Sequence, residues 1–164
     1  MTALNLADQI DYHSFSFLMT RDAEGSTIDF GTPKTEERIA EGTELEYIRI
    51  LDDFYWSALC QGFAIGSTEN AWKWGSVEGE FDTVSLGQVY SIFDTGSAAI
   101  ILPSFYFNHF LGQLFEAIGE TQFHLEEGYV FSKCYDNFPT IHFLFDNKWI
   151  AVETVDYMID ASAA

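Results

Sequence analysis

The chain has 164 residues, of which 48% are hydrophobic and 17% aromatic, so it is long enough for one domain with a sizeable core. Its 26 acidic residues against 7 basic ones give a formal net charge of −19, which argues against nucleic acid or an anionic membrane surface as a partner, because both attract Lys and Arg. The longest apolar run, Ile100 to Leu111, is too short to span a bilayer, and Met1 to Ile10 lacks the pattern of a signal peptide.

The acidic excess favours a protein that works at low pH. Carboxylates repel one another in a compact fold at neutral pH, and protonation relieves that repulsion. We therefore expect a secreted protein, or one of an acidic compartment such as a vesicle, vacuole or lysosome, whose targeting segment lies outside this chain. An acidic surface that serves only solubility explains the composition equally well.

Neither a metal nor a cofactor is indicated. Two cysteines, Cys60 and Cys134, lie far apart and could pair, stay reduced or have partners elsewhere. No Cys/His cluster with zinc spacing occurs. The four scattered histidines are expected to be surface or structural residues: His13, His109, His124 and His142.

Short alternating runs separated by turn residues indicate strands in the first part of the chain. Residues 14–20 and 26–31 flank a turn signal and predict a hairpin. Residues 45–50, 54–59 and 62–65 predict further strands. Residues 69–85 are expected to form a hairpin or a surface loop.

One helix is expected in the second part, after a strand at 89–93 and an apolar run at 98–102. Ser104 is expected to cap it, because apolar residues then recur at three- and four-residue spacing as far as Ile118. Gly119 is expected to end it.

Three short strands are predicted after the helix, at 129–132, 140–145 and 149–152, with a turn between the last two. The whole pattern predicts one mostly β domain over residues 1–164 with one main helix.

The most informative stretch runs from Ile92 to Ser97, where an apolar strand delivers Asp94 into a tight turn. The strand would fix the direction of the carboxylate. Gly96 permits the turn and leaves no Cβ to crowd a second copy of the loop. The Thr95 hydroxyl can bond to a partner loop, and the Ser97 hydroxyl can donate to the Asp94 carboxylate.

An Asp-Thr-Gly triplet alone is weak, because ordinary Asx turns also contain it. Its context, with an apolar strand before it and Ala98 to Ile101, Pro103 and a helix after it, resembles the second active-site loop of pepsin-like aspartic proteases. Residues 15–31 look like the hairpin at the entry to that family's C-terminal lobe, and residues 42–66 look like the strands that follow.

The resemblance continues to about Asp160. Residues 134–145 are similar to the family's Cys followed by Leu-Pro-x-Ile-x-Phe-x-Phe, with Phe138 in the place of Leu, and Tyr157 stands where the family often has an aromatic residue. This implies one lobe of a pepsin-like β-barrel fold, the C-terminal lobe, truncated at its C-terminal end.

The resemblance also implies an aspartic endopeptidase that needs no metal or cofactor. Two Asp side chains, one from each lobe, would hold a water between them. One would act as general base on the water, and the other would protonate the carbonyl oxygen of the peptide substrate. Asp94 would be one of the two, with Thr95, Gly96 and Ser97 completing the catalytic loop. Ala98 and Ala99 would contact the substrate, although family members commonly carry a hydroxyl at the position of Ala98.

The chain departs from the family pattern in three further ways. Val84 follows Asp82 and Thr83 where a second triplet would need glycine. The apolar-apolar-Gly element that the family places on a later strand does not occur after Pro139. The usual downstream partner of Cys134 does not occur either, so a bridge to Cys60 is one option among several.

Three functions remain open from the sequence. The first is an endopeptidase lobe completed by a missing N-terminal lobe or by a second copy of this chain in a homodimer. The alternative is a non-catalytic protease-like lobe that acts as a binding or assembly subunit. The third is an unrelated β-rich domain with a chance triplet.

Overall fold

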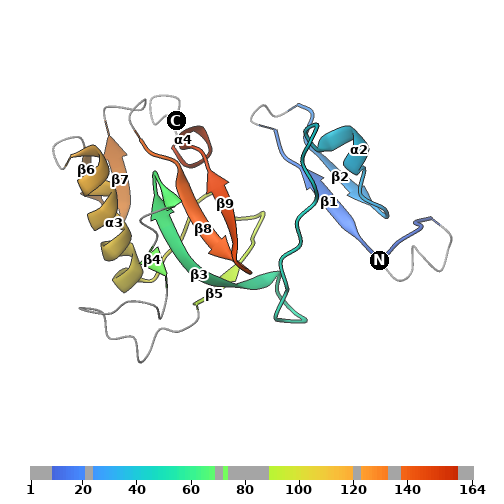
Figure 1. Cartoon of the computed structure of the whole chain (residues 1–164), viewed down its shortest axis with the longest axis horizontal. Coiled ribbons are helices and arrows are strands. Elements are labelled where there is room, and N and C mark those ends of the chain that lie inside the picture. Colours follow the sequence, from blue (N-terminus) through green and yellow to red (C-terminus); the bar gives the residue numbers. More distant parts are fainter. Residues whose placement is uncertain are drawn as a thin grey trace. The chain divides into compact units, whose positions relative to one another are not determined.

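The computed structural model describes residues 9–20, 24–68, 72–73, 89–119, 123–132 and 138–158 (Figure 1). They belong to two compact units, Met1–Tyr47 and Ile48–Ala164. Strand residues outnumber helical ones, which confirms the predicted mostly β class. Within these ranges, no helix is long and apolar enough to cross a membrane. The prediction of a single domain stays a prediction.

The first unit is built on the predicted hairpin. Strands β1 (Phe15–Leu18) and β2 (Thr27–Phe30) pair antiparallel, with Phe15 opposite Phe30. A short helix that the sequence did not predict, α2 (Thr35–Arg38), follows. Nη2 of Arg38 lies 2.5 Å from Oδ2 of Asp29 and donates to Oγ1 of Thr27, so the ion pair holds α2 against β2.

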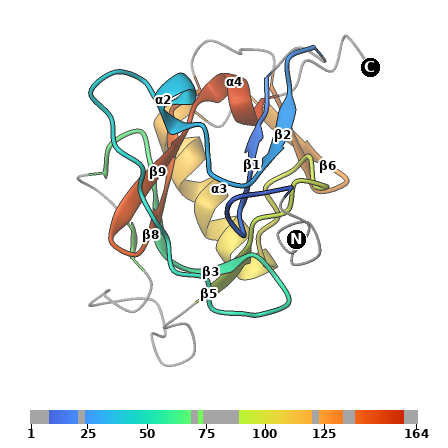
Figure 2. The same cartoon turned by 90° about the vertical axis from the view of Figure 1, so that its right-hand side faces the viewer.

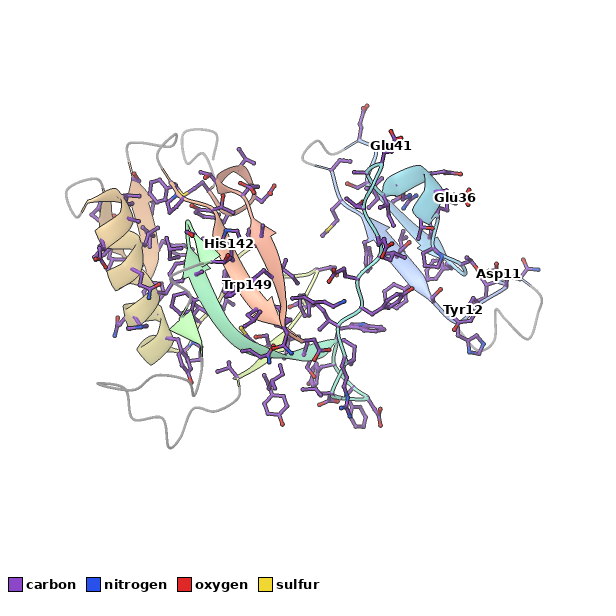
Figure 3. The ribbon with its side chains drawn as sticks, viewed as in Figure 1. Asp11, Tyr12, Glu36, Glu41, His142 and Trp149 are labelled. Carbon is purple, nitrogen blue, oxygen red and sulfur yellow. The ribbon has the colours of Figure 1, made fainter. Side chains whose placement is uncertain are left out.

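An aspartate fastens the segment before the hairpin to its end. The Asp11 carboxylate accepts hydrogen bonds from the Thr32 backbone nitrogen at 2.9 Å and the Thr32 hydroxyl at 2.7 Å. Gly31 lies beside it with φ of +99°, and a Cβ there would stand 2.5 Å from Oδ1 of Asp11. Figure 3 labels Asp11 and its neighbour Tyr12. The close approach of the carboxylate and the positive φ together require glycine.

The second unit contains an antiparallel sheet in the order β4-β3-β8-β9, with β5 also paired to β3 (Figure 1). Its strands are β3 (Ser57–Ile65), β4 (Trp72–Lys73), β5 (Val89–Ile92), β8 (Ile141–Phe145) and β9 (Lys148–Val152). β5 pairs with the first half of β3 and β4 with its second half. The sheet thus places the end of β5 beside the start of β3.

Two strand predictions are corrected by the structure. Residues 54–59 and 62–65 were predicted as separate strands, but β3 is continuous from Ser57, with a register shift between Cys60 and Gly62. Residues 45–50 form no strand. There the Arg49 backbone nitrogen donates to Oδ2 of Asp146 at 2.8 Å, so a side chain replaces the ladder that the alternation predicted.

Two-residue turns close the later hairpins. Asp146 and Asn147, with φ of 48° and 61°, join β8 to β9 as predicted. Glu127 and Gly128 join β6 (Phe123–Glu126) to β7 (Tyr129–Ser132). Positive φ at both central residues matches the twist of antiparallel strands. β7 confirms a prediction, whereas β6 was not predicted.

The main helix, α3 (Ser104–Ile118), confirms the predicted span. Ser104 is its first residue rather than its cap, because Pro103 holds the N-cap position and no side chain bonds there. Gly119, with φ of 87°, ends it and donates its N–H to the Phe115 carbonyl, as predicted.

The core forms where α3 packs against β3 (Figure 2). The ring of Phe63 is fully buried, and its centroid lies 5.4 Å from that of Phe110 and 6.2 Å from that of His109. The buried cluster comprises Ala58, Cys60, Phe63, Tyr106, Phe110, Leu111, Leu114, Phe138, Ile141 and Phe145. Burial lowers the pKa of His109 and raises the pKa of Tyr106.

The end of the described chain is attached to the sheet by side chains. A last short helix, α4 (Thr154–Tyr157), donates from the Thr154 hydroxyl to the Phe138 carbonyl and from the Tyr157 hydroxyl to the Pro139 carbonyl. His142 on β8 contacts the Gly66 carbonyl through Nε2 and lies beside Trp149 of β9, with ring centroids 6.4 Å apart (Figure 3). These contacts stabilise the sheet whose strand β5 leads to Asp94.

Candidate active site

Asp94 follows directly on an anchored strand. β5 pairs with β3 through Ile92, which lies opposite Ser57. One residue further, the Phe93 backbone nitrogen donates to the Trp56 carbonyl at 2.9 Å, and the Phe93 ring lies 5.2 Å from that of Phe145. The pairing therefore holds the chain up to the residue before Asp94, as the sequence predicted for an apolar strand.

The turn itself holds the carboxylate. The Gly96 backbone nitrogen donates to Oδ1 of Asp94 at 2.9 Å, and the Ser97 backbone nitrogen donates to the Asp94 carbonyl at 3.2 Å. A Cβ on Gly96 would lie 3.2 Å from the same Oδ1. The φ of Gly96 lies outside the left-handed region, so the backbone angle does not require glycine. The close approach of the Asp94 carboxylate is what favours glycine at this position.

The expected role of Ser97 is not what the structure shows. Its hydroxyl donates to the Ala99 carbonyl at 3.2 Å rather than to the Asp94 carboxylate. A hydroxyl has one proton to donate, so it orders the residues after the turn instead. Thr95 is exposed, as are Ala98 and Ala99, which leaves the predicted substrate side of the loop open to solvent.

The described residues bring one predicted catalytic carboxylate to this loop. Asp94 is exposed, and its Oδ1 is held by a backbone N–H while the side chain faces solvent. A single carboxylate can accept a proton from a water molecule, but the two-carboxylate mechanism needs a second carboxyl group to share the proton. In the part of the chain that the structure describes, no group of three His, Cys, Asp or Glu side chains is placed to hold a metal ion.

The structure describes one of the two cysteines considered above and leaves other residues of the sequence analysis outside its described ranges. Cys60 is a buried free thiol whose S–H donates to the Gly62 carbonyl at 3.4 Å. Cys134, Asp82, Thr83 and the greater part of 69–85 lie outside the described residues.

Sequence reasoning missed the turn that borders the site. Phe54, Tyr55 and Trp56 were predicted as part of a strand, but they form an exposed turn before β3. Oδ1 of Asp52 accepts the Phe54 backbone N–H at 2.6 Å, which is an Asx turn. The paired Asp52 and Asp53 were the signal that could have predicted it.

A protein-family model described as eukaryotic aspartyl protease matches residues 1–164. The match therefore includes both compact units as well as the Asp94 loop. No curated protein matches the chain.

Proposed function

The chain belongs to the eukaryotic aspartyl protease family, and we propose that it acts as an aspartic-type endopeptidase lobe that supplies one catalytic carboxylate, Asp94. The observation that carries the proposal is the hydrogen bond from the Gly96 backbone N–H to Oδ1 of Asp94, at the end of an anchored strand. That bond holds the carboxylate in one orientation and leaves its other lone pairs for water and substrate.

The reaction needs a second carboxylate opposite Asp94. Two carboxyl groups at close range ionise in separate steps, so one is charged while the other keeps its proton. The charged member takes a proton from the attacking water, and the protonated member donates to the carbonyl oxygen of the scissile peptide bond. A second lobe or a second copy of this chain would supply the other member.

The assignment to a C-terminal lobe rests on the order of the elements. A hairpin comes first, then the β3–β5 pair that carries the loop, and then the long helix α3 directly after it. In this assignment Ala98 and Ala99 line the substrate side of the loop, where both are exposed.

An acidic working environment belongs to the same proposal. The net charge of −19 at neutral pH and the sequence pI of about 4.1 mean that charge repulsion within the fold decreases as the pH falls. We propose that the protein is secreted or belongs to an acidic vesicle, vacuole or lysosome-like compartment.

The test is cleavage of an acid-unfolded protein between about pH 3 and 6 by the chain and by Asp94→Asn. Glu116→Gln, an exposed position on α3, is the matched control because it removes the same charge. Cleavage by the chain and the control but not by Asp94→Asn supports the proposal. Equal cleavage by all three would exclude Asp94 as a catalytic residue.

A second candidate is a protease-like lobe that binds without catalysis. The exposed apolar side chains next to the loop, such as Phe54 and Ile101, favour a binding role whether or not the loop is active. Absence of cleavage by the chain under all conditions, together with binding through this surface, would favour this candidate.

A further inference from the structure

The contact between the rings of Phe93 and Phe145 joins the base of the Asp94 loop to the core. The centroids of the two rings lie 5.2 Å apart, and the ring planes are inclined by 48°. Phe145 is 5% exposed, whereas Phe93 is 44% exposed. Because Phe93 directly precedes Asp94, the contact lies one residue from the carboxylate that the proposed function uses.

Strand pairing holds Phe145 on both sides. It is the last residue of β8 and lies opposite Cys60 of β3 and Lys148 of β9. It also belongs to the buried cluster between the sheet and α3. A ring enclosed in this way changes its position little, because neighbouring atoms at the packing density of a protein core oppose any shift.

The turn that follows Phe145 adds further attachments. The Asn147 backbone nitrogen donates to Oε1 of Gln61 at 2.7 Å, and Nε2 of Gln61 donates to Oδ1 of Asn147. Oδ2 of Asp146 accepts the Arg49 backbone N–H at 2.8 Å. Gln61 lies at the register shift of β3, and Figure 1 shows β3 and β8 side by side. These bonds keep the end of β8 in place beside β3.

The backbone fixes the catalytic loop at fewer points. The pairing of β5 with β3 ends at Ile92, and the next bond along the chain runs from the Phe93 N–H to the Trp56 carbonyl. Within the described part of the chain, the hydrogen bonds of the turn itself join residues of the segment 94–99 to one another. A tilt of the turn about the Phe93 bond would redirect the carboxylate, and the contact of the two rings opposes that tilt.

We infer that Phe145 is a positioning residue for Asp94: its buried ring, acting through the ring of Phe93, keeps the carboxylate in the orientation that catalysis uses. The inference rests on the proposed function for the catalytic role of Asp94. Displacement of a reacting group by about 1 Å lowers a rate by as much as about 100-fold, so a contact that prevents such a displacement matters to the reaction.

The first experiment measures kcat and KM for cleavage of an acid-unfolded protein by Phe145→Leu, which removes the ring but keeps an apolar side chain. We expect kcat to fall roughly tenfold while KM changes less than about twofold, because the orientation of the carboxylate is altered and substrate binding is not. Phe63→Leu, at a fully buried ring of β3, is the matched control. It should lower the midpoint of urea unfolding but leave kcat unchanged.

Variants of Phe93 test the connection without disturbing the core, because this ring is half exposed. Phe93→Leu should lower kcat as Phe145→Leu does, whereas Phe93→Tyr keeps the ring and should retain most of the activity. The double variant Phe93→Leu with Phe145→Leu should lose no more activity than either single variant, because both changes break the same contact. Losses that multiply in the double variant would contradict an action of Phe145 through Phe93.

An NMR measurement separates this inference from the proposed function. The Gly96 amide donates to Oδ1 of Asp94, so its chemical shift should follow the titration of that carboxyl group. Phe145→Leu and Phe93→Leu should weaken this pH-dependent shift, and Phe63→Leu should preserve it. If the parent chain cleaves nothing, the proposed function fails, and the Gly96 signal still decides whether Phe145 positions the carboxylate.

Three results would overturn the inference. The first is an unchanged Gly96 shift in Phe145→Leu, and the second is an unchanged kcat of that variant while the parent chain is active. The third is an equal effect of Phe63→Leu, which would show that any damage to the core disturbs the loop. Cleavage that survives in Asp94→Asn would reject the proposed function, while a weakened Gly96 shift in Phe145→Leu would still support the positioning of Asp94.

Discussion

The backbone nitrogen of Gly96 lies 2.9 Å from Oδ1 of Asp94, so the residue that completes the turn also holds the carboxylate that the turn presents. A side chain at this position would meet the same oxygen at 3.2 Å, which is closer than an ordinary van der Waals contact. The turn and the orientation of the carboxylate are therefore one structural feature, and a change to either alters the other.

Substitution of this glycine should reduce activity more than stability. In Gly96→Ala the new Cβ pushes the Asp94 carboxylate away from the backbone N–H, and displacement of a catalytic group by a fraction of an ångström to 1 Å lowers the rate roughly 10–100-fold. Because the loop is exposed, the free energy of unfolding should change by less than about 1 kcal/mol. Peptidase assays and urea unfolding measure the two effects.

Gly112→Ala is the matched control for that substitution. Gly112 lies within α3, and a Cβ there meets nothing within 4 Å. Alanine should stabilise the helix by about 0.5–1 kcal/mol and leave cleavage unchanged. Equal activities for the two alanine variants would contradict the role assigned to Gly96.

The ring of Phe63 should contribute more to stability than any exposed aromatic residue. It is fully buried between β3 and α3, in contact with Phe110 and His109. Phe63→Ala should lower the free energy of unfolding by about 3–5 kcal/mol through lost burial and a cavity, whereas Phe63→Leu should cost less because leucine fills part of the space. Urea denaturation gives both values, and a loss below about 1 kcal/mol for alanine would refute this description of the core.

Acid should destabilise the protein through His109. Burial lowers the pKa of His109 below its ordinary value of 6.5, because the charged ring loses water against the core. Above pH 6.5 the ring is neutral in both states and the pKa shift has no effect on stability. As the pH falls below 6.5 the unfolded chain takes up the proton first, so stability decreases until the pH reaches the folded pKa and then levels off.

Urea unfolding across that pH range tests the histidine. His109→Gln should lose part of the slope of stability against pH below 6.5, while His124→Gln, at an exposed histidine, should keep it. An unchanged slope in the His109 variant would show that its protonation is not linked to unfolding.

Asp11 should also make the protein less stable in acid, but at a lower pH than His109 does. The hydrogen bonds from the Thr32 hydroxyl and the Thr32 backbone nitrogen lower the pKa of Asp11 below 3.8. Its contribution to stability is thus complete above pH 3.8 and disappears as the pH falls through the folded pKa. An NMR titration should give a midpoint below 3.8 for the Asp11 carboxyl, with the Thr32 amide shift following it.

A variant separates this bond from general acid effects. Asp11→Asn should remove the titration from the Thr32 amide signal, and Glu41→Gln, at an exposed carboxylate in the same unit, should not. A midpoint at or above 3.8 in the parent chain would contradict the bonding seen here.

Local sequence determined the elements whose signals are complete within a few residues. The 15-residue periodic run fixed α3 from Ser104 to Ile118, with Gly119 as its end, because apolar spacing and a positive-φ residue are both local properties. The same holds for the hairpin of β1 and β2 and for the turn at Asp146 and Asn147. The apolar strand before Asp94 and the glycine after it likewise predicted where the carboxylate would stand.

Contacts between residues far apart in the sequence determined the other features of the fold and the site, and no local sequence pattern predicts such contacts. Residues 45–50 alternate like a strand, yet Arg49 bonds to the side chain of Asp146 instead of to a neighbouring strand. The expected bond from Ser97 to Asp94 is replaced by one to Ala99, because the path of the backbone sets which acceptor the hydroxyl reaches. Sequence by itself determined the family's loop and its order of elements. Only the tertiary structure decided which groups hold Asp94 and which apolar side chains stay exposed around it, because hydrogen bonds and burial depend on residues brought together from far along the chain.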